Sequence, residues 1–530
     1  MRDSRQVRIL PEAIEAETSP STPLVRVLSE SGIFLRHDCG GKGRCHKCRV
    51  VVEPEGQAAA TVEACTYRVE DNLTVRIPES SRVNALVVDK APLVFPPHFA
   101  STPPSNATPH YGMAVDLGTT TIAGYLCETN GRRVIASAAV KNPQSIYGDD
   151  VINRIGAIAA AKGKVRLLQQ PVVRIIERAI SDLCRKAAIP PSQVDSLVVS
   201  GNPTMLHILL GVDPEPIGCS PYVPVFTAAQ TRRADELGFA TFTGTVRTLP
   251  LVSGFIGADT IAATIAVDLP NQPVGTLMVD LGTNGELVLA GERGLIATSC
   301  ATGPAFEGAT LSCGMQATPG AIDRVELDDQ CSVATCSIIG ADRAGSRPLP
   351  AGICGSGIIS AVTALRRHGI IADSGAFRAV AGHPLLQRDA EGRQSYILVE
   401  GTKTEDGLPI TISQKDIRAV QLGKAALRTG IDFLLRAAGL AAPSQILLAG
   451  AFGSNIAAGD LISLGILPNI DHRHIRSLGN AAGAGTVMVL GDPSCRRLAD
   501  DMAAAITAID LAASPDFHKV FVDNLAFTSS

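Results

Sequence analysis

The sequence lacks the features of a membrane or exported protein. None of its apolar runs approaches the ~20 residues that a helix needs to span a bilayer. The first ten residues, MRDSRQVRIL, contain no apolar core of a signal peptide. These absences predict a cytoplasmic protein without a membrane partner.

Tryptophan is absent, and only 18% of the residues are charged, with a formal net charge of −4. This balance gives no global reason to expect binding to nucleic acid. The 45% hydrophobic content is ordinary for globular domains and excludes general disorder. A chain of 530 residues is too long for one hydrophobic core, so we expect ~3 or 4 compact units.

The 13 cysteines are an odd number in a chain without an export signal, which argues against a disulfide framework. Four of them cluster near the N-terminus, three within CGGKGRCHKC: Cys39, Cys45, Cys48 and Cys65. Their spacing supplies four thiolates that could bind iron or zinc. No C-x2-C-x2-C triplet occurs in the sequence, so a [4Fe-4S] centre is not expected.

The glycines between these cysteines favour an iron-sulfur cluster. Gly40, Gly41 and Gly43 let backbone N–H groups approach the sulfides, whereas a zinc site normally shows two C-x2-C pairs. The loop resembles the [2Fe-2S] loop of plant- and adrenodoxin-type ferredoxins, although the stretch from Cys48 to Cys65 is shorter than is usual there. Zinc and four free thiols stay open as alternatives. The flanking segments QVRIL, LVRVLSES, CRVVVE and LTVRIP predict a β-grasp domain over residues 1–80, with a helix that opens at Ser21-Thr22.

Basic residues surround the cysteine loop, with only Asp38 opposing them: Arg36, Lys42, Arg44, Lys47 and Arg49. A positive loop should raise the reduction potential of a cluster and favour docking of an acidic partner. A solvated face is the alternative interpretation. Cys300, Cys313 and Cys354 lie in Gly-rich loops further along, where we expect buried thiols rather than redox centres.

A Pro-, Ser- and Thr-rich stretch, FPPHFASTPPSNATPH, predicts a linker, which we place at residues 81–111. An internal repeat follows: MAVDLGTTTIAGYL at residues 113–126 and LMVDLGTNGELVLA at residues 277–290. Each reads as strand, turn and strand, with Asp116 or Asp280 at the end of the first strand. Backbone N–H groups and hydroxyls of such a turn can cradle phosphate, while the carboxylate faces a hydrated Mg²⁺.

A third segment, QILLAGAFGSNIAAGDLI, has small residues that let backbone approach an adenosine. The order of the three segments resembles the superfamily of acetate and sugar kinases, heat-shock chaperone ATPases and actin, in which two duplicated α/β lobes close on ATP. The resemblance implies two phosphate loops and an adenosine loop, formed respectively by Asp116, Gly118, Thr119 and Thr120, by Asp280, Gly282, Thr283 and Asn284, and by Gly450 and Gly453. Gly201, Asn202, Gly355 and Ser356 are further pocket candidates.

Nearly the whole chain resembles the reductive activators of corrinoid enzymes. The segments SGNPTMLHILLG, SGFIGADTIAA, TGPAFEGATLSCGM, GICGSGII and LAGAFGSNI look like that family's, in the same order. The resemblance implies an α/β chain with a [2Fe-2S] ferredoxin-type domain (1–80), a linker (81–111) and two actin-like lobes (112–275 and 276–530). It also allows a homodimer.

The implied activity is ATP-dependent transfer of one electron from the cluster to the Co(II) corrinoid of a methyltransferase corrinoid protein, which yields Co(I). An upstream electron donor would reload the cluster. Asp116 and Asp280 would position Mg²⁺ and phosphate, and Glu286 or Glu307 would orient the attacking water. A redox-regulated small-molecule kinase and a ferredoxin-type carrier with a vestigial nucleotide fold are the alternatives.

Overall fold

The computed structural model describes residues 4–36, 39, 41–82, 109–130, 133–161, 164–282, 284–308, 311–329, 334–340, 348–378, 383–450 and 456–528. Most of the predicted linker lies outside these ranges. Within the described ranges, no helix combines the length and apolarity that a membrane span requires.

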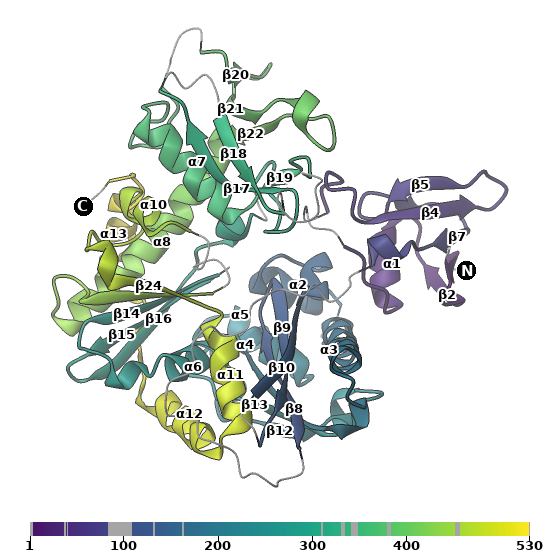
Figure 1. The fold of residues 1–530 in the computed structure, drawn as a ribbon, viewed down its shortest axis with the longest axis horizontal. Helices are drawn as coiled ribbons and strands as arrows, with labels where there is room; N and C mark the ends of the chain where they lie inside the picture. Colours follow the sequence, from purple (N-terminus) through teal and green to yellow (C-terminus); the bar gives the residue numbers. More distant parts are fainter. Residues whose placement is uncertain are drawn as a thin grey trace.

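The N-terminal region is a five-stranded mixed sheet with one helix packed on it (Figure 1). The sheet order is β2 (Ile14–Thr18), β1 (Arg5–Leu10), β7 (Leu73–Arg76), β4 (Arg49–Pro54) and β5 (Ala60–Glu63). β1 and β7 are parallel, and the other neighbours are antiparallel. Alternation decides which face is buried, because Val7 and Ile9 enter the core with α1 (Leu24–Glu30) while Arg8 points outward.

The α1 helix begins later than predicted. Ser21 and Thr22 do not cap it: the Ser21 hydroxyl donates to Glu70 and the Thr22 hydroxyl to the carbonyl of Ser19. Thr22 and Pro23 instead form a short strand, β3 (Thr22–Pro23), which pairs with β6 (Arg68–Val69). The helix therefore starts only at Leu24, after Pro23.

A six-stranded sheet forms the middle lobe. Its order is β10 (Arg133–Lys141), β9 (Thr121–Glu128), β8 (Tyr111–Leu117), β11 (Val194–Gly201), β13 (Thr245–Thr248) and β12 (Thr231–Arg233). β8 pairs antiparallel with β9 and parallel with β11. Figure 1 shows α3 (Arg166–Ala187) on one side of this sheet and α6 (Ala258–Ala266) and α11 (Ala481–Gly491) on the other.

The C-terminal lobe repeats this plan. Its sheet order is β24 (Ile475–Gly479), β23 (Gln445–Ala449), β14 (Thr276–Leu281), β15 (Gly285–Gly291), β16 (Gly294–Cys300) and β25 (Thr507–Ala508). β14 pairs antiparallel with β15 and parallel with β23, as β8 does with β9 and β11. The two hairpins predicted from the internal repeat are thus confirmed in equivalent positions of two sheets.

Two helices connect the lobes. The core that packs on the middle sheet extends through α6 and α11 to Met278, Val288 and Leu447 of the C-terminal sheet.

The predicted helix that ends at Gly439 is confirmed as α8 (Gln414–Ala438), with a capping box at Ser413 and Gly439 in the left-handed conformation. Further helices are α2 (Val151–Ala160), α4 (Pro203–Leu209), α5 (Glu215–Gly218), α7 (Gly355–Arg367), α10 (Ala458–Ser463), α12 (Pro493–Ala505) and α13 (Phe517–Asp523).

Two three-stranded sheets extend the C-terminal lobe toward the N-terminal domain (Figure 1). One has the order β18 (Ala334–Ile338), β17 (Ala321–Leu327) and β19 (Gly352–Ile353), and the other β20 (Leu386–Arg388), β21 (Gln394–Val399) and β22 (Ile410–Ser413). These additions bring residues 311–313 and 405–409 against the cysteine loop.

Candidate functional site

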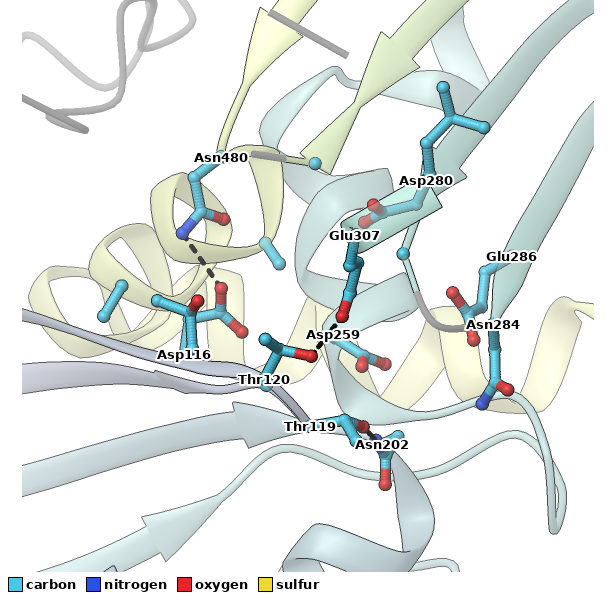
Figure 2. A pocket seen from close by; sticks show the side chains of 17 residues that line it. Asp116, Thr119, Thr120, Asn202, Asp259, Asp280, Asn284, Glu286, Glu307 and Asn480 are labelled. Carbon is cyan, nitrogen blue, oxygen red and sulfur yellow. Dashed lines mark hydrogen bonds between the residues drawn. The ribbon is translucent and has the colours of Figure 1, made fainter. Parts of the chain in front are cut away.

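A cavity of about 140 Å³ lies between the two lobes, at the turns that follow β8 and β14 (Figure 2). It brings together most of the predicted nucleotide residues: Asp116, Gly118, Thr119, Thr120, Asn202, Asp280, Gly282, Asn284, Glu286, Glu307 and Gly450. Thr283 and Gly453 lie outside the described residues. Gly201, Gly355 and Ser356 are not among the lining residues; the last two begin α7.

The first phosphate loop, Gly118 to Thr120, is held from beneath by three side chains. Asn142 donates to the Gly118 carbonyl at 2.9 Å, and Asn202 donates to the Thr119 hydroxyl at 2.9 Å. Arg154, on α2, is fully buried and donates to the Thr119 carbonyl at 2.6 Å. This loop is therefore fixed by side chains of the middle lobe itself.

The second phosphate loop, Gly282 to Asn284, has fewer described supports. The Gly282 N–H donates to the Asn284 carbonyl at 3.1 Å, which closes the turn. The Thr302 hydroxyl donates to the Gly282 carbonyl at 3.1 Å. In both loops the N–H of the first glycine closes the turn of a strand hairpin: Gly118 donates to the Thr121 carbonyl and Gly282 to the Asn284 carbonyl.

Five carboxylates face the cavity: Asp116, Asp259, Asp280, Glu286 and Glu307 (Figure 2). Burial, together with the charge of Asp116, raises the pKa of Asp259 to about 7. Burial and the neighbouring carboxylates raise the pKa of Asp280 to about 7 and that of Glu286 well above its ordinary value. Such a cluster must be neutralised, either by protons or by a cation.

The arrangement suits a hydrated cation rather than a closed metal cage. Among the described residues, no three His, Cys, Asp or Glu side chains converge on one metal position. Mg²⁺ usually keeps several waters and takes one or two carboxylates plus the phosphates of a substrate. A Mg²⁺ bound together with a nucleotide fits these carboxylates.

Asn480, at the start of α11, contacts the strand that leads into the first phosphate loop. It donates to Asp116 at 2.9 Å and to the Tyr125 hydroxyl at 3.0 Å, and its own oxygen caps α11. The Asp116 carboxylate thus accepts a hydrogen bond from a side chain, whereas the Asp280 carboxylate receives none from any described side chain. The pKa of Tyr125 is raised by burial, so its hydroxyl stays protonated.

Gly450 is positioned beside Asp280 by the parallel pairing of β23 with β14. Its φ is +91°, and a Cβ there would lie 2.5 Å from Asp280 Oδ1. Only glycine fits this close approach. The segment of small residues that was predicted to approach adenosine therefore contacts Asp280 and Leu281, immediately before the second phosphate loop, through Gly450.

A hydrogen bond crosses the cleft between the lobes. The Thr120 hydroxyl, from the middle lobe, donates to Glu307, at the end of the 3-10 turn Pro304–Glu307 (Figure 2). Glu286 lies on β15 and accepts from the Ser299 hydroxyl at 3.5 Å. Both predicted glutamates thus reach the cavity from the C-terminal lobe.

Sequence reasoning missed Asp259, Asn480 and Arg154. Asp259 lies within SGFIGADTIAA, a segment that carried the family resemblance but had no assigned role. Asn480 precedes the Gly- and Ala-rich helix α11, and an Asn before a helix is a capping signal that could have drawn attention to it. Arg154 has no local signal in the sequence.

The four N-terminal cysteines form two contacting pairs. A hydrogen bond from Cys45 lowers the pKa of Cys39 to about 5, and one from Cys65 lowers the pKa of Cys48. The same bonds raise the pKa of Cys45 and of Cys65. Cys39, Cys45 and Cys48 are buried and Cys65 is half-buried.

Three basic residues of the cysteine loop, Lys42, Arg44 and Lys47, contact the C-terminal lobe of the same chain. Arg44 Nε lies 2.9 Å from Asp406 Oδ2, and Lys47 Nζ lies 3.3 Å from Glu405 Oε1. These residues were expected to face solvent or a separate acidic protein. In this structure their acidic partners lie far along the same chain. The expected buried state of Cys300, Cys313 and Cys354 is confirmed.

The chain is similar to known proteins over nearly its whole length. Residues 111–272 match the family described as "RACo middle region", and residues 275–530 match "C-terminal domain of RACo the ASKHA domain". The corrinoid activation enzyme RamQ of Eubacterium limosum is 31% identical over 97% of both chains. A [Co(II) methylated amine-specific corrinoid protein] reductase of Methanosarcina barkeri is 24% identical, over 79% of this chain and 77% of its own. The solved structure of a reductive activator for corrinoid, iron-sulfur protein aligns with a TM-score of 0.72 and 25% identity, over 99% of this chain and 98% of that one.

Proposed function

The chain belongs to the RACo family of corrinoid activators, and we propose that it reduces the Co(II) corrinoid of a methyltransferase corrinoid protein to Co(I). One electron leaves the protein and one cobalt centre accepts it, while ATP is hydrolysed at the cavity between the lobes. The observation that carries this proposal is that one chain contains both a cavity lined by two loops of repeated sequence and a loop with three buried cysteines and a fourth half-buried one. The relatives named as activators and reductases of corrinoid proteins support the choice of partner.

The cysteine pairs support a [2Fe-2S] cluster held by Cys39, Cys45, Cys48 and Cys65. Two pairs suit a cluster of two irons, whereas a structural zinc needs four ligands around one ion. When bound, such a cluster supplies electrons one at a time. The N-terminal sheet, with its parallel central pair and α1 across it, supports a β-grasp ferredoxin domain at residues 1–80. The linker (81–111) and the lobes (112–275 and 276–530) complete the proposed division.

The residues of the cavity divide into phosphate, magnesium and adenosine groups. Phosphates would bind to the two loops through Gly118, Thr119, Thr120, Gly282, Thr283 and Asn284. Asp116 and Asp280 would hold hydrated Mg²⁺, which neutralises their charge and so relieves their mutual repulsion. Gly450 and Gly453 would leave room for the adenosine.

Three carboxylates are candidates to orient the attacking water. Glu286 and Glu307 were predicted for this role. Asp259 joins them, because a pKa of about 7 leaves its carboxylate able to accept a proton near neutral pH. Burial and the charges of Asp259 and Asp280 raise the pKa of Glu286 well above its ordinary value, so its carboxyl group takes up a proton more readily than that of an exposed glutamate.

The test is to mix the anaerobically reduced protein with a Co(II) corrinoid protein and to record the visible spectrum. We expect the absorption of Co(I) with Mg-ATP, and none without nucleotide. A non-hydrolysable analogue separates the roles of ATP binding and ATP hydrolysis. Asp116→Asn provides the matched variant, which should bind the corrinoid protein but give no Co(I).

Two outcomes would favour the alternatives. ATP consumption without Co(I), across several corrinoid proteins, would point to a redox-regulated small-molecule kinase. Formation of Co(I) that is independent of nucleotide and unaffected in Asp116→Asn would point to a carrier with a vestigial nucleotide fold. The upstream electron donor, a homodimer and a cytoplasmic location stay predictions.

A further inference from the structure

A second, smaller cavity of about 20 Å³ adjoins the nucleotide cavity. Cys39, Thr120, Arg154 and Glu307 are among its lining residues. Thr120 and Glu307 also line the nucleotide cavity, and the hydrogen bond across the cleft joins them (Figure 2). The same pair of side chains therefore borders both the place where phosphates would bind and a space beside a cysteine of the proposed cluster.

The surroundings of the smaller cavity transmit charge well. The cavity has room for about one water molecule. Cys39 is 2% exposed and Arg154 is fully buried, so solvent screens the charges of these side chains only weakly. Charges placed around this cavity therefore act on one another more strongly than charges at the protein surface do.

Ion pairs of the basic loop fix the cysteine loop at this position. Arg44 Nε lies 2.9 Å from Asp406 Oδ2, and the two side chains are only 15% and 5% exposed. Lys47 Nζ lies 3.3 Å from Glu405 Oε1. The cysteine loop is thus docked beside the nucleotide cavity, and charge in that cavity can act on it without any movement of the chain.

Arg154 shows that charge is felt across this region. Burial lowers the pKa of its guanidinium to about 10, while the charges of Asp149 and Glu307 act in the opposite direction. The guanidinium stays protonated at neutral pH and offsets a neighbouring carboxylate. Mg²⁺ neutralises only part of the charge of a triphosphate, so bound Mg-ATP would add net negative charge beside Thr120.

The reduction potential of an iron-sulfur cluster depends on the net charge around it. Reduction adds one negative charge to a cluster that four thiolates already make negative. Further negative charge nearby therefore disfavours the reduced form and lowers the potential.

We propose that Thr120 and Glu307 hold bound Mg-ATP close enough to Cys39 to lower the reduction potential of a cluster at that cysteine. Because coupling between two sites is reciprocal, reduction of the cluster weakens the binding of Mg-ATP by the same factor. Binding of ATP alone then makes the stored electron more strongly reducing, before any hydrolysis. The coupling rests on the cluster and nucleotide of the proposed function, but not on the corrinoid partner.

The potential is measured on the cluster-loaded protein, without any corrinoid protein. Anaerobic titration against redox dyes is run without nucleotide, with Mg²⁺ alone, and with Mg²⁺ and a non-hydrolysable ATP analogue. Electron paramagnetic resonance quantifies the reduced cluster. We expect the analogue to lower the ratio of reduced to oxidised cluster about tenfold at a fixed dye potential, which is ~59 mV for a one-electron couple. Mg²⁺ alone should not lower the potential, because it adds positive charge.

Calorimetry measures the same coupling from the side of the nucleotide. The dissociation constant of the analogue with Mg²⁺ should be about tenfold larger for the reduced protein than for the oxidised protein. Agreement between the two factors would exclude an effect of the nucleotide on the dyes.

Two variants with the same change of charge locate the effect. Glu307→Gln removes a carboxylate beside the cavity of Cys39 and should raise the potential measured without nucleotide. Glu128→Gln is the matched control, because Glu128 pairs with Arg133 and lies at the opposite end of β9 from Thr121, which follows the first phosphate loop. The potential of this control should equal that of the wild type.

Three results would overturn the inference. The first is a potential that stays constant or rises while calorimetry shows the analogue to be bound. The second is equal affinity of the oxidised and reduced proteins for the analogue. The third is a shift in Glu128→Gln as large as that in Glu307→Gln.

The outcome for the proposed function is separate. If the potential falls as expected while no corrinoid protein is reduced, the coupling stands and the proposed function fails. If Co(I) forms with Mg-ATP while the potential stays constant, the proposed function stands and the coupling fails. A purified protein that holds zinc in place of iron would overturn both.

Discussion

The two phosphate loops share a sequence and a hairpin, yet they differ in what surrounds them. Arg154, Asn142 and Asn202 hold the first loop, and Asn480 donates to its aspartate. The described supports of the second loop are the bond within its own turn and the Thr302 hydroxyl. The repeated motif thus gives the two loops the same backbone turn. Side chains from elsewhere in the chain decide how many hydrogen bonds hold each loop and each aspartate.

The two aspartates should differ most when the cavity is empty. Asp280 is buried among like charges without a described donor, whereas the charge of Asp116 is shared with Asn480. The Asp116 carboxylate therefore has a hydrogen-bond partner even in the empty cavity. The Asp280 carboxylate is stabilised in its charged form only when a cation binds.

Replacing either aspartate should have the largest effect. We expect Asp116→Asn and Asp280→Asn each to lower the rate of ATP hydrolysis by ~10²–10³, because each removes charge that positions Mg²⁺. The melting temperatures of the two variants without nucleotide should differ. Asp280→Asn should unfold at a higher temperature than the wild type, since the repulsion between buried carboxylates is relieved. Asp116→Asn should not, because it loses the charge-assisted bond from Asn480. Wild-type hydrolysis by Asp280→Asn would remove Asp280 from the magnesium site.

Removing the supports beneath the loops should have the next largest effect. Arg154→Gln leaves the carbonyls of Thr119 and Gly148 without a donor and should lower the free energy of unfolding by ~3 kcal/mol. Thr302→Val, beneath the second loop, removes one hydroxyl donor and should cost ~1 kcal/mol. Urea titration measures both. Equal losses would show that the two loops are equally supported.

A further effect depends on pH. The pKa values of Asp259 and Asp280 are raised to about 7 in the folded chain, above their ordinary values, so the folded state binds protons more readily than the unfolded chain. The stability of the nucleotide-free protein should therefore fall as pH rises from about 4 to about 7, and level off above.

Mg²⁺ reverses this trend, because it needs ionised carboxylates. Thermal melting with and without Mg²⁺ should show a stabilisation that grows by about 2 °C between pH 5 and pH 8. Asp280→Asn should reduce this pH dependence. A gain from Mg²⁺ that is constant over this range would mean that the carboxylates do not titrate there.

Much of the fold could be predicted from the sequence, because strand and hairpin patterns are local. The repeat of Asp-Leu-Gly-Thr predicted two equivalent turns, and the structure brings both to one cavity. Asp259 and Asn480 could not be assigned, since they enter the cavity from the starts of α6 and α11, and no local pattern marks that convergence.

The position of the basic loop against the C-terminal lobe could not be predicted from the sequence either. Its charge predicted an acidic partner, and the partners of Lys47 and Arg44 are Glu405 and Asp406, more than 300 positions away. Pairing of charges over such separations depends on how the small sheets of the C-terminal lobe are placed. Composition and spacing carry no information about that placement.

The position of α11 has a consequence for how the chain is made. This helix packs against β8 and β11, and its Thr486 hydroxyl donates to Ser200 at 2.6 Å, although it is separated from those strands by almost the whole C-terminal lobe. During synthesis the middle lobe emerges first, and of α6 and α11 only α6 is then available to cover that face of its sheet. Because the bond to Asp116 requires Asn480, the first half of the cavity is completed only after residues 276–480 have been synthesised.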